Sequence, residues 1–159
     1  MRVGVGYDSH RFDDTRPLIL GGVEIPDEPG LRGHSDGDAI CHAVTDAILG
    51  AAGLGDIGRL FPDTDPANEG AASVDMLVDA VRLLHRGGYR VSNVDVTVVA
   101  ERPKILPVAD AMAQRMAPIL GVESGSVSIK GKSNEGMGWI GRGEGLAVIA
   151  VAAITTASS

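Results

Sequence analysis

Residues 146–154 read Leu-Ala-Val-Ile-Ala-Val-Ala-Ala-Ile, and this stretch decides the fold class because every position is apolar. A strand with one wet face alternates apolar and polar residues, so an unbroken apolar run predicts a strand buried on both faces. Three further strands are predicted from alternating β-branched residues, at 2–12, 94–98 and 127–129. The final strand is therefore expected to lie inside a sheet.

Three helices are predicted between these strands from apolar residues at helical spacing. The first begins at a cap provided by Ser35 or Asp36 and ends at Gly53. The second runs from its capping residue Ser73 to Arg86, and the third runs from Pro107, a favoured first-turn residue, to Gly121. A hairpin is predicted around Gly21-Gly22, followed by a loop at 26–33.

This element order predicts one domain, 1–159, of the α+β class: a layered sandwich with a mixed β-sheet and helices on one face. Helices on one side alone would leave the other face of the last strand in water. Another subunit is therefore expected to cover that face.

Composition excludes several kinds of partner. The formal net charge of −7 argues against nucleic acid and against an anionic membrane, because both require a positive field. Cys41 is the single cysteine, so no internal disulfide can form, and a reducing, cytoplasmic compartment is predicted. No signal peptide is visible, and the longest apolar run is shorter than the ~20 residues that span a bilayer.

Asp8, His10 and His42 form a candidate metal site. Asp8 and His10 are two residues apart on a predicted strand, so their side chains share a face, and His42 lies on the first helix. Two imidazoles and one carboxylate suit Zn²⁺, and three protein ligands leave a fourth position for water or substrate. The set therefore predicts a catalytic metal site.

Spacing alone leaves an alternative open, in which Asp8 caps a turn, His10 is exposed and His42 is a hydrogen-bonded core histidine. Asp46 lies one helical turn after His42, where it would accept the second N–H of a ligating imidazole. The alternative for Asp46 is a solvated acid. The glycine-dense segment 131–145 predicts close approach of the backbone to a ligand.

Ordered motifs extend over essentially the whole chain. They are Gly6-Tyr7-Asp8-Ser9-His10, Gly33-His34-Ser35-Asp36-Gly37-Asp38, Gly55-Asp56-Ile57-Gly58, Phe61-Pro62-Asp63-Thr64-Asp65, Pro103-Lys104-Ile105-Leu106-Pro107 and Gly138-Trp139-Ile140-Gly141-Arg142-Gly143-Glu144-Gly145. Together they resemble the 2-C-methyl-D-erythritol 2,4-cyclodiphosphate synthase family of the non-mevalonate isoprenoid pathway. The resemblance implies a chorismate mutase-like sandwich whose sheets pack around the axis of a homotrimer.

The resemblance also implies a lyase reaction. The 2-phosphate of 4-diphosphocytidyl-2-C-methyl-D-erythritol 2-phosphate attacks the β-phosphorus, CMP leaves and a cyclic diphosphate forms. Asp8, His10 and His42 match the family's Zn²⁺ ligands, and Glu135 matches the carboxylate for a second ion, Mg²⁺ or Mn²⁺, that bridges the diphosphate. Catalytic residues implied by the match are His34, Ser133 and Glu135.

The resemblance further implies three sets of substrate contacts. The metal and erythritol side comprises Asp8, His10, His34, Ser35, Asp56, Ile57, Gly58, Phe61, Pro62, Asp63, Thr64 and Asp65. The cytidine side comprises Ala100, Pro103, Lys104, Ile105, Leu106, Gly131, Lys132, Ser133 and Asn134, with Lys104 on the α-phosphate. Trp139 and Arg142 match a cavity near the threefold axis that holds a prenyl diphosphate in the family, and the alternative for Arg142 is an ion pair with Glu144.

Two positions depart from the family pattern, since Lys132 adds a cation and Trp139 replaces the usual Phe. Two rival functions use the same residues: a Zn-dependent nucleotide phosphohydrolase and a non-catalytic trimeric nucleotide-binding module. Products separate the first rival from the synthase, and binding of cytidine nucleotides without turnover identifies the second.

Overall fold

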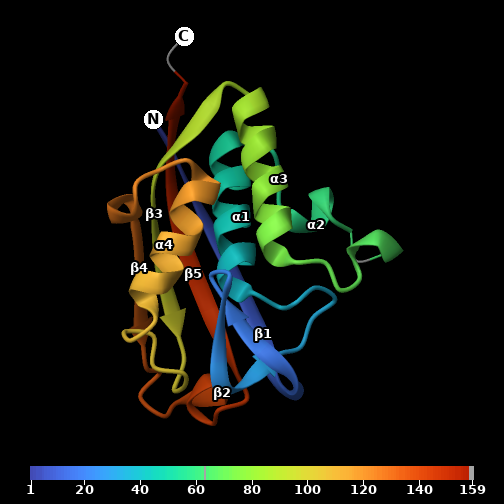
Figure 1. The fold of residues 1–159 in the computed structure, drawn as a ribbon, viewed down its shortest axis with the longest axis vertical. Coiled ribbons are helices and arrows are strands. Elements are labelled where there is room, and N and C mark those ends of the chain that lie inside the picture. Colours follow the sequence, from blue (N-terminus) through green and yellow to red (C-terminus); the bar gives the residue numbers. More distant parts are fainter. Residues whose placement is uncertain (63, 158–159) are drawn as a thin grey trace.

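In the computed structural model, which describes residues 1–62 and 64–157, helices pack on one face of a twisted sheet (Figure 1). The elements are β1 (Arg2–Leu20), β2 (Val23–Leu31), α1 (Ala39–Ala52), α2 (Ile57–Leu60), η1 (Pro66–Asn68), α3 (Ser73–Arg86), β3 (Tyr89–Val99), α4 (Ala109–Leu120), η2 (Ser124–Ser126), β4 (Val127–Lys132), α5 (Gly138–Gly141) and β5 (Gly145–Thr156). Among the described residues, no helix is both long and apolar enough to cross a membrane.

The five strands form a sheet in the order β2-β1-β5-β3-β4. Strands β3 and β4 are parallel and the other neighbours are antiparallel, so the predicted mixed sheet is confirmed. The apolar strand β5 lies at the centre between β1 and β3, as its sequence predicts. This position surrounds its backbone with ladder hydrogen bonds on both edges.

Helix α1 packs unusually close to β1 because glycine occupies two inward positions of that strand. A Cβ atom at Gly4 would collide with the carbonyl oxygen of Ala47, and one at Gly6 would collide with that of Ala43. Small residues on both elements thus allow the backbones to approach. The close approach brings His42 of α1 to the end of β1, where Asp8 and His10 lie.

Several predicted boundaries are wrong. The helix expected from Pro107 begins at Ala109, and the strand expected at 94–98 runs from Tyr89 to Val99. The loop expected at 26–33 is largely the second half of β2, which extends to Leu31. The cap of α1 is Asp38, whose carboxylate accepts hydrogen bonds from the N–H groups of Ile40 and Cys41, in place of Ser35 or Asp36. Ser73 is the first residue of α3 and is not its cap.

The sheet face opposite the helices is apolar and exposed in the single chain. Val3, Val5 and Tyr7 of β1 pair with Ala153, Val151 and Ile149 of β5 on this face. Val5 is 65% exposed and Tyr7 is 56% exposed. Large exposed apolar patches of this kind mark interaction surfaces, as the sequence of β5 predicts.

Candidate functional site

The structure brings Asp8, His10 and His42 together at one point. The distances are 2.8 Å from His10 Nε2 to Asp8 Oδ2, 3.1 Å from His42 Nδ1 to Asp8 Oδ2, and 3.4 Å between the two ring nitrogens. Ligand atoms about 2.0–2.1 Å from a tetrahedral zinc ion lie roughly 3.3 Å apart. The three groups therefore fit one divalent ion, and the alternative in which Asp8 caps a turn, His10 is exposed and His42 is a separate core histidine is excluded.

The ring of His10 is oriented by a backbone acceptor. Its Nδ1 atom lies 2.6 Å from the carbonyl oxygen of Arg32, which only accepts hydrogen bonds, so Nδ1 carries the proton. The other nitrogen, Nε2, faces Asp8 and His42, and with an ion bound between the three groups it would offer its lone pair to that ion. This is the usual outer-shell arrangement of a metal-binding histidine.

Charge coupling keeps Asp8 ionised. Burial by itself raises the pKa of Asp8, but hydrogen bonds from His10 and His42 outweigh it, and the pKa lies below its ordinary value. Burial likewise lowers the pKa of His10, yet the hydrogen bond to Asp8 outweighs that effect and raises it. An ionised carboxylate is the form that binds a metal ion.

The predicted contact between Asp46 and His42 is wrong. Asp46 Oδ1 instead accepts a hydrogen bond of 2.7 Å from the N–H of Ile57, at the first turn of α2, and burial raises the pKa of this carboxyl. His42 Nε2 faces two hydroxyls, Ser73 Oγ at 2.9 Å and Ser35 Oγ at 3.1 Å. Spacing on α1 predicted Asp46 as the partner of His42, whereas the nearest partner of Nε2 is Ser73, the first residue of α3.

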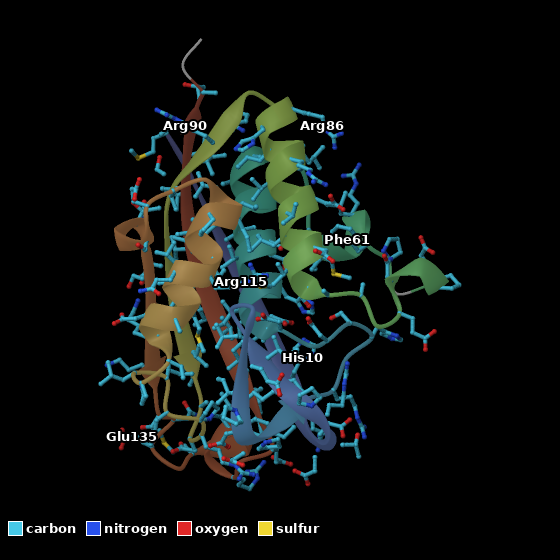
Figure 2. The ribbon with its side chains drawn as sticks, viewed as in Figure 1. His10, Phe61, Arg86, Arg90, Arg115 and Glu135 are labelled. Carbon is cyan, nitrogen blue, oxygen red and sulfur yellow. The ribbon has the colours of Figure 1, made fainter. Side chains whose placement is uncertain are left out.

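The metal cluster lies in a cavity of about 250 Å³ (Figure 2, at His10 and Phe61). Its lining residues are Asp8, His10, Gly33, His34, Ser35, His42, Ile57, Gly58, Phe61, Asn68 and Met76. Five of the residues predicted to contact substrate beyond Asp8 and His10 thus line this cavity (His34, Ser35, Ile57, Gly58 and Phe61), and Asn68 and Met76 were not foreseen. Asn68 belongs to η1 and Met76 belongs to α3. Sequence spacing does not predict where these two elements lie relative to the cavity.

Among the described residues, Asp56, Pro62, Thr64 and Asp65 do not line the cavity. Asp56 Oδ1 accepts a hydrogen bond of 2.9 Å from the N–H of Arg59 and caps α2. Pro62, Thr64 and Asp65 lie in the adjoining segment, and Asp63 falls outside the described residues. Their contact with a substrate stays a prediction.

Arg16 fastens the loop that carries His34 and Ser35. Its guanidinium donates to the carbonyl oxygens of Leu31 at 3.0 Å and Gly33 at 2.8 Å, and also to that of Ser35. A planar fork with several donors suits this task better than an ammonium group. No sequence pattern indicates this role, because the contacts join segments that only the β1–β2 pairing brings together.

A second cavity of about 340 Å³ lies between the end of β3 and the strand β4. It is lined by Ala100, Pro103, Lys104, Ile105, Leu106, Ile129, Lys130, Gly131, Lys132 and Ser133. All of the predicted cytidine-side residues except Asn134 are here. The side-chain amide of Asn134 instead donates to the carbonyl oxygen of Met137 at 2.8 Å.

The loop that carries Ser133 and Glu135 is held by Glu101, a residue that sequence analysis missed. Glu101 Oε1 accepts hydrogen bonds from the N–H groups of Asn134 at 3.0 Å and Gly136 at 3.1 Å. These two groups flank Glu135, whose backbone is left-handed with φ of 52°. Ser133 Oγ in turn donates to Glu135 Oε1 at 3.0 Å.

A third cavity of about 220 Å³ is lined by Ser9, His10, Arg11, Trp139 and Glu144. Trp139 thus lines a cavity of the single chain, and its place near a threefold axis stays a prediction. Arg142 does not line this cavity, since its guanidinium pairs with Glu144 Oε2 at 2.9 Å. The ion pair that the sequence left as an alternative is therefore formed within the chain.

The fold and site define an α+β protein with a candidate divalent-metal site and a separate, lysine-lined pocket. Residues 1–155 match the model of the YgbB family, and the chain belongs to this family. The resemblance inferred from the sequence motifs is confirmed.

Similar proteins match this chain over nearly its full length. The 2-C-methyl-D-erythritol 2,4-cyclodiphosphate synthase of Gemmatimonas aurantiaca is 62% identical over 159 residues, covering 100% of this chain and 96% of the relative. Among solved structures, bifunctional IspDF from Campylobacter jejuni matches with a TM-score of 0.94 and 41% identity, covering 98% of this chain and 42% of that one. IspF of Plasmodium falciparum, solved as a CDP complex, matches with a TM-score of 0.86 and 34% identity, covering 99% and 97%.

Proposed function

We propose that the protein converts 4-diphosphocytidyl-2-C-methyl-D-erythritol 2-phosphate to 2-C-methyl-D-erythritol 2,4-cyclodiphosphate and CMP in isoprenoid biosynthesis. The observation that carries the proposal is the intact Asp8/His10/His42 cluster in a chain 62% identical, over its whole length, to a synthase of this activity. Curated relatives favour the synthase over a phosphohydrolase or a non-catalytic nucleotide-binding module.

The reaction joins two mutually repelling phosphates of one flexible molecule. An oxygen of the 2-phosphate attacks the β-phosphorus, the new P–O bond forms, and the bond to the α-phosphate oxygen breaks with CMP taking the electron pair. No covalent enzyme intermediate is required, so the residues contribute by positioning and by neutralising charge. We assign His34, Ser35 and Ser133 to orienting the reacting phosphates and Lys104 to the α-phosphate.

Two kinds of divalent ion complete this site. Asp8, His10 and His42 would hold one ion, with zinc favoured by the donor set, and that ion would supply Lewis-acid charge. Glu135 would hold a second, hard ion, Mg²⁺ or Mn²⁺. The carboxylate of Glu135 is exposed and accepts a hydrogen bond from Ser133. Such a group suits a hard cation, because Mg²⁺ needs only one or two protein carboxylates where substrate phosphates supply the other ligands.

The lysine-lined pocket is assigned to the cytidine diphosphate moiety. A relative of this fold is described as a CDP complex. Lys104, Lys130 and Lys132 all border the pocket, and Lys130 is paired with Asp95, which leaves Lys104 and Lys132 as the cations for the phosphates. Gly131 keeps the pocket open, since a Cβ atom there would lie 2.9 Å from Ile105 Cβ.

A homotrimer is proposed because one chain leaves the site divided. His10 and Glu135 lie in different parts of the fold (Figure 2), and the metal cavity shares no lining residue with the lysine-lined pocket. The exposed apolar face of β1 and β5 offers the surface through which copies associate. Neighbouring chains would then place one chain's metal cavity against the next chain's pocket.

Phosphorus NMR of a single incubation tests the proposed function. The cytidine-linked substrate, Zn²⁺ and Mg²⁺ are mixed with the protein, and a cyclic diphosphate plus CMP is expected. A linear phosphate product would support the phosphohydrolase instead. Binding without any product would support the non-catalytic module. A prenyl ligand beside Trp139 and a cytoplasmic location stay predictions.

Replacing Glu101 with alanine is expected to lower kcat and to raise the Mg²⁺ concentration needed for half-maximal rate. The reason is that the two N–H groups flanking Glu135 lose their acceptor, and each net hydrogen bond contributes about 0.5–1.5 kcal/mol to holding the loop. With two such groups freed at the surface, roughly a tenfold loss in kcat is expected. The measurement is a Mg²⁺ titration of turnover.

Glu101→Gln is the matched control, because the amide oxygen of glutamine accepts the same two hydrogen bonds without the charge. It is expected to retain most of the rate and the Mg²⁺ dependence. Equal losses in the two variants would show that the charge of Glu101, and not its bonds to the loop, matters for turnover.

A further inference from the structure

His42 has a buried partner on the side of its ring that faces away from the metal cluster. Its Nε2 atom lies 2.9 Å from the hydroxyl of Ser73, the first residue of α3. Ser73 has no exposed surface, and Ser35, whose hydroxyl lies 3.1 Å from the same nitrogen, is 4% exposed. Buried polar groups of this kind keep their hydrogen bonds, because losing one costs free energy.

The direction of these hydrogen bonds follows from the metal cluster. His42 Nδ1 faces Asp8 and His10, so it must offer a lone pair to the ion, and Nε2 must carry the proton. Nε2 therefore donates to the Ser73 hydroxyl. That hydroxyl in turn donates to the carboxylate of Asp36, which makes a hydrogen-bonded chain from His42 through Ser73 to Asp36.

Asp36 is itself fixed in place as the end of this chain. Its Oδ2 accepts a 3.2 Å hydrogen bond from the N–H of Ser73, and its Oδ1 accepts one of 3.1 Å from the N–H of Asp38. Helix α3 has no side-chain cap on its own N-cap residue, Ala72, so Asp36 takes that role from outside the helix. The positive end of the helix dipole favours a carboxylate at this position.

We propose that Ser73 is a positioning residue for the metal site. Its hydroxyl links His42 to the carboxylate of Asp36 by hydrogen bonds, and these bonds fix the tautomer and the orientation of the ligating ring. A carboxylate behind a ligating imidazole raises the basicity of the metal-binding nitrogen, and here a hydroxyl stands between the two groups. The inference rests on the proposed function only in assuming that Asp8, His10 and His42 bind a divalent ion.

Ser73 is better suited to this role than Ser35. Ser35 belongs to the loop that lines the cavity, and its hydroxyl also accepts a 3.2 Å hydrogen bond from the N–H of Gly37. Ser73 stands on a helix whose core face, including Leu77, is buried. The helix therefore sets the place of Ser73 next to His42.

The test is the zinc dissociation constant, measured by competition with a chelating dye in the absence of substrate. Ser73→Ala is expected to raise this constant roughly 10–100-fold, the usual cost of removing an outer-shell partner. Asp36→Asn, which keeps the hydroxyl but removes the charge, is expected to raise it in the same direction by less. If Ser73→Ala does not fold by circular dichroism, the result for Asp36→Asn decides the proposal.

Thr45→Val is the matched control. Thr45 lies on α1 like His42, has no exposed surface, and within the described residues its hydroxyl has no hydrogen-bond partner. The variant removes a buried hydroxyl of similar size and is expected to leave zinc affinity unchanged. An equal loss in Thr45→Val and Ser73→Ala would overturn the proposal, because it would reflect general loosening of the helix.

A second readout follows the proton on His42 itself. In the zinc-loaded protein, the Nε2–H of His42 is expected as a slowly exchanging signal in ¹H–¹⁵N spectra, and Ser73→Ala is expected to lose it to solvent exchange. Unchanged zinc affinity together with an unchanged signal would overturn the role of Ser73 while leaving the proposed function standing. Failure of the wild-type protein to bind zinc would overturn both, and zinc binding without cyclic product would overturn the function alone.

Discussion

Replacing His42 with alanine is expected to abolish stable zinc binding and to lower kcat/KM by roughly 10³-fold. The reason is that two ligands remain where the site needs three, and a bound metal ion supplies several kcal/mol of transition-state charge stabilisation. Each 1.36 kcal/mol corresponds to about a tenfold change in rate, so a loss of about 4 kcal/mol gives this factor. Metal content by atomic spectroscopy and turnover of the cytidine-linked substrate are the measurements.

His85→Ala provides the control for this prediction. His85 lies exposed in the last turn of α3 and belongs to none of the three cavities around the proposed site. Its removal is expected to change neither metal content nor turnover. Retention of wild-type turnover by a His42→Ala protein free of zinc would contradict a catalytic role for the metal site.

The central strand β5 was predictable because burial on both faces requires apolar residues. The edge strand β2 was not predictable over its full length, because an edge strand tolerates proline and glycine. The apolar run of β5 correctly predicts a central strand. The segment after Pro26, with Pro29 and Gly30, has loop-like composition, yet it pairs with β1 through a register shift near Pro17. Because β2 is the edge strand, a proline there sacrifices no ladder hydrogen bond inside the sheet.

The grouping of Asp8, His10 and His42 was predictable because local geometry fixes it. Alternation along β1 puts Asp8 and His10 on one face, and an amphipathic helix must pack on that face, which leaves His42 within reach. Their outer partners were not predictable in the same way. Ser73 contacts His42 and Glu101 contacts Asn134, and each pair is more than thirty positions apart in the sequence. No periodic pattern in the sequence indicates contacts between residues so far apart.

The proposed division of the site between subunits has a direct consequence when two inactive variants are mixed. His42→Ala damages the metal cavity, and Lys104→Glu damages the lysine-lined pocket by placing a negative charge beside the α-phosphate. Each variant alone is expected to be nearly inactive. Co-expression with two affinity tags, followed by tandem purification, yields trimers that contain both chains.

Activity is expected to return in these mixed trimers. A functional site needs an intact cavity, supplied by the Lys104→Glu chain, and an intact pocket, supplied by a neighbouring His42→Ala chain. Every trimer that contains both chains has one site of its three that meets both conditions, so about a third of wild-type turnover is expected. A mixture of His42→Ala with Asp8→Ala is the control and should stay inactive, because both lesions lie in the same half of the site. Absence of recovery in the first mixture, with trimers present, would mean that cavity and pocket of one chain serve the same substrate, and the apolar face of β1 and β5 would then have no part in building the site.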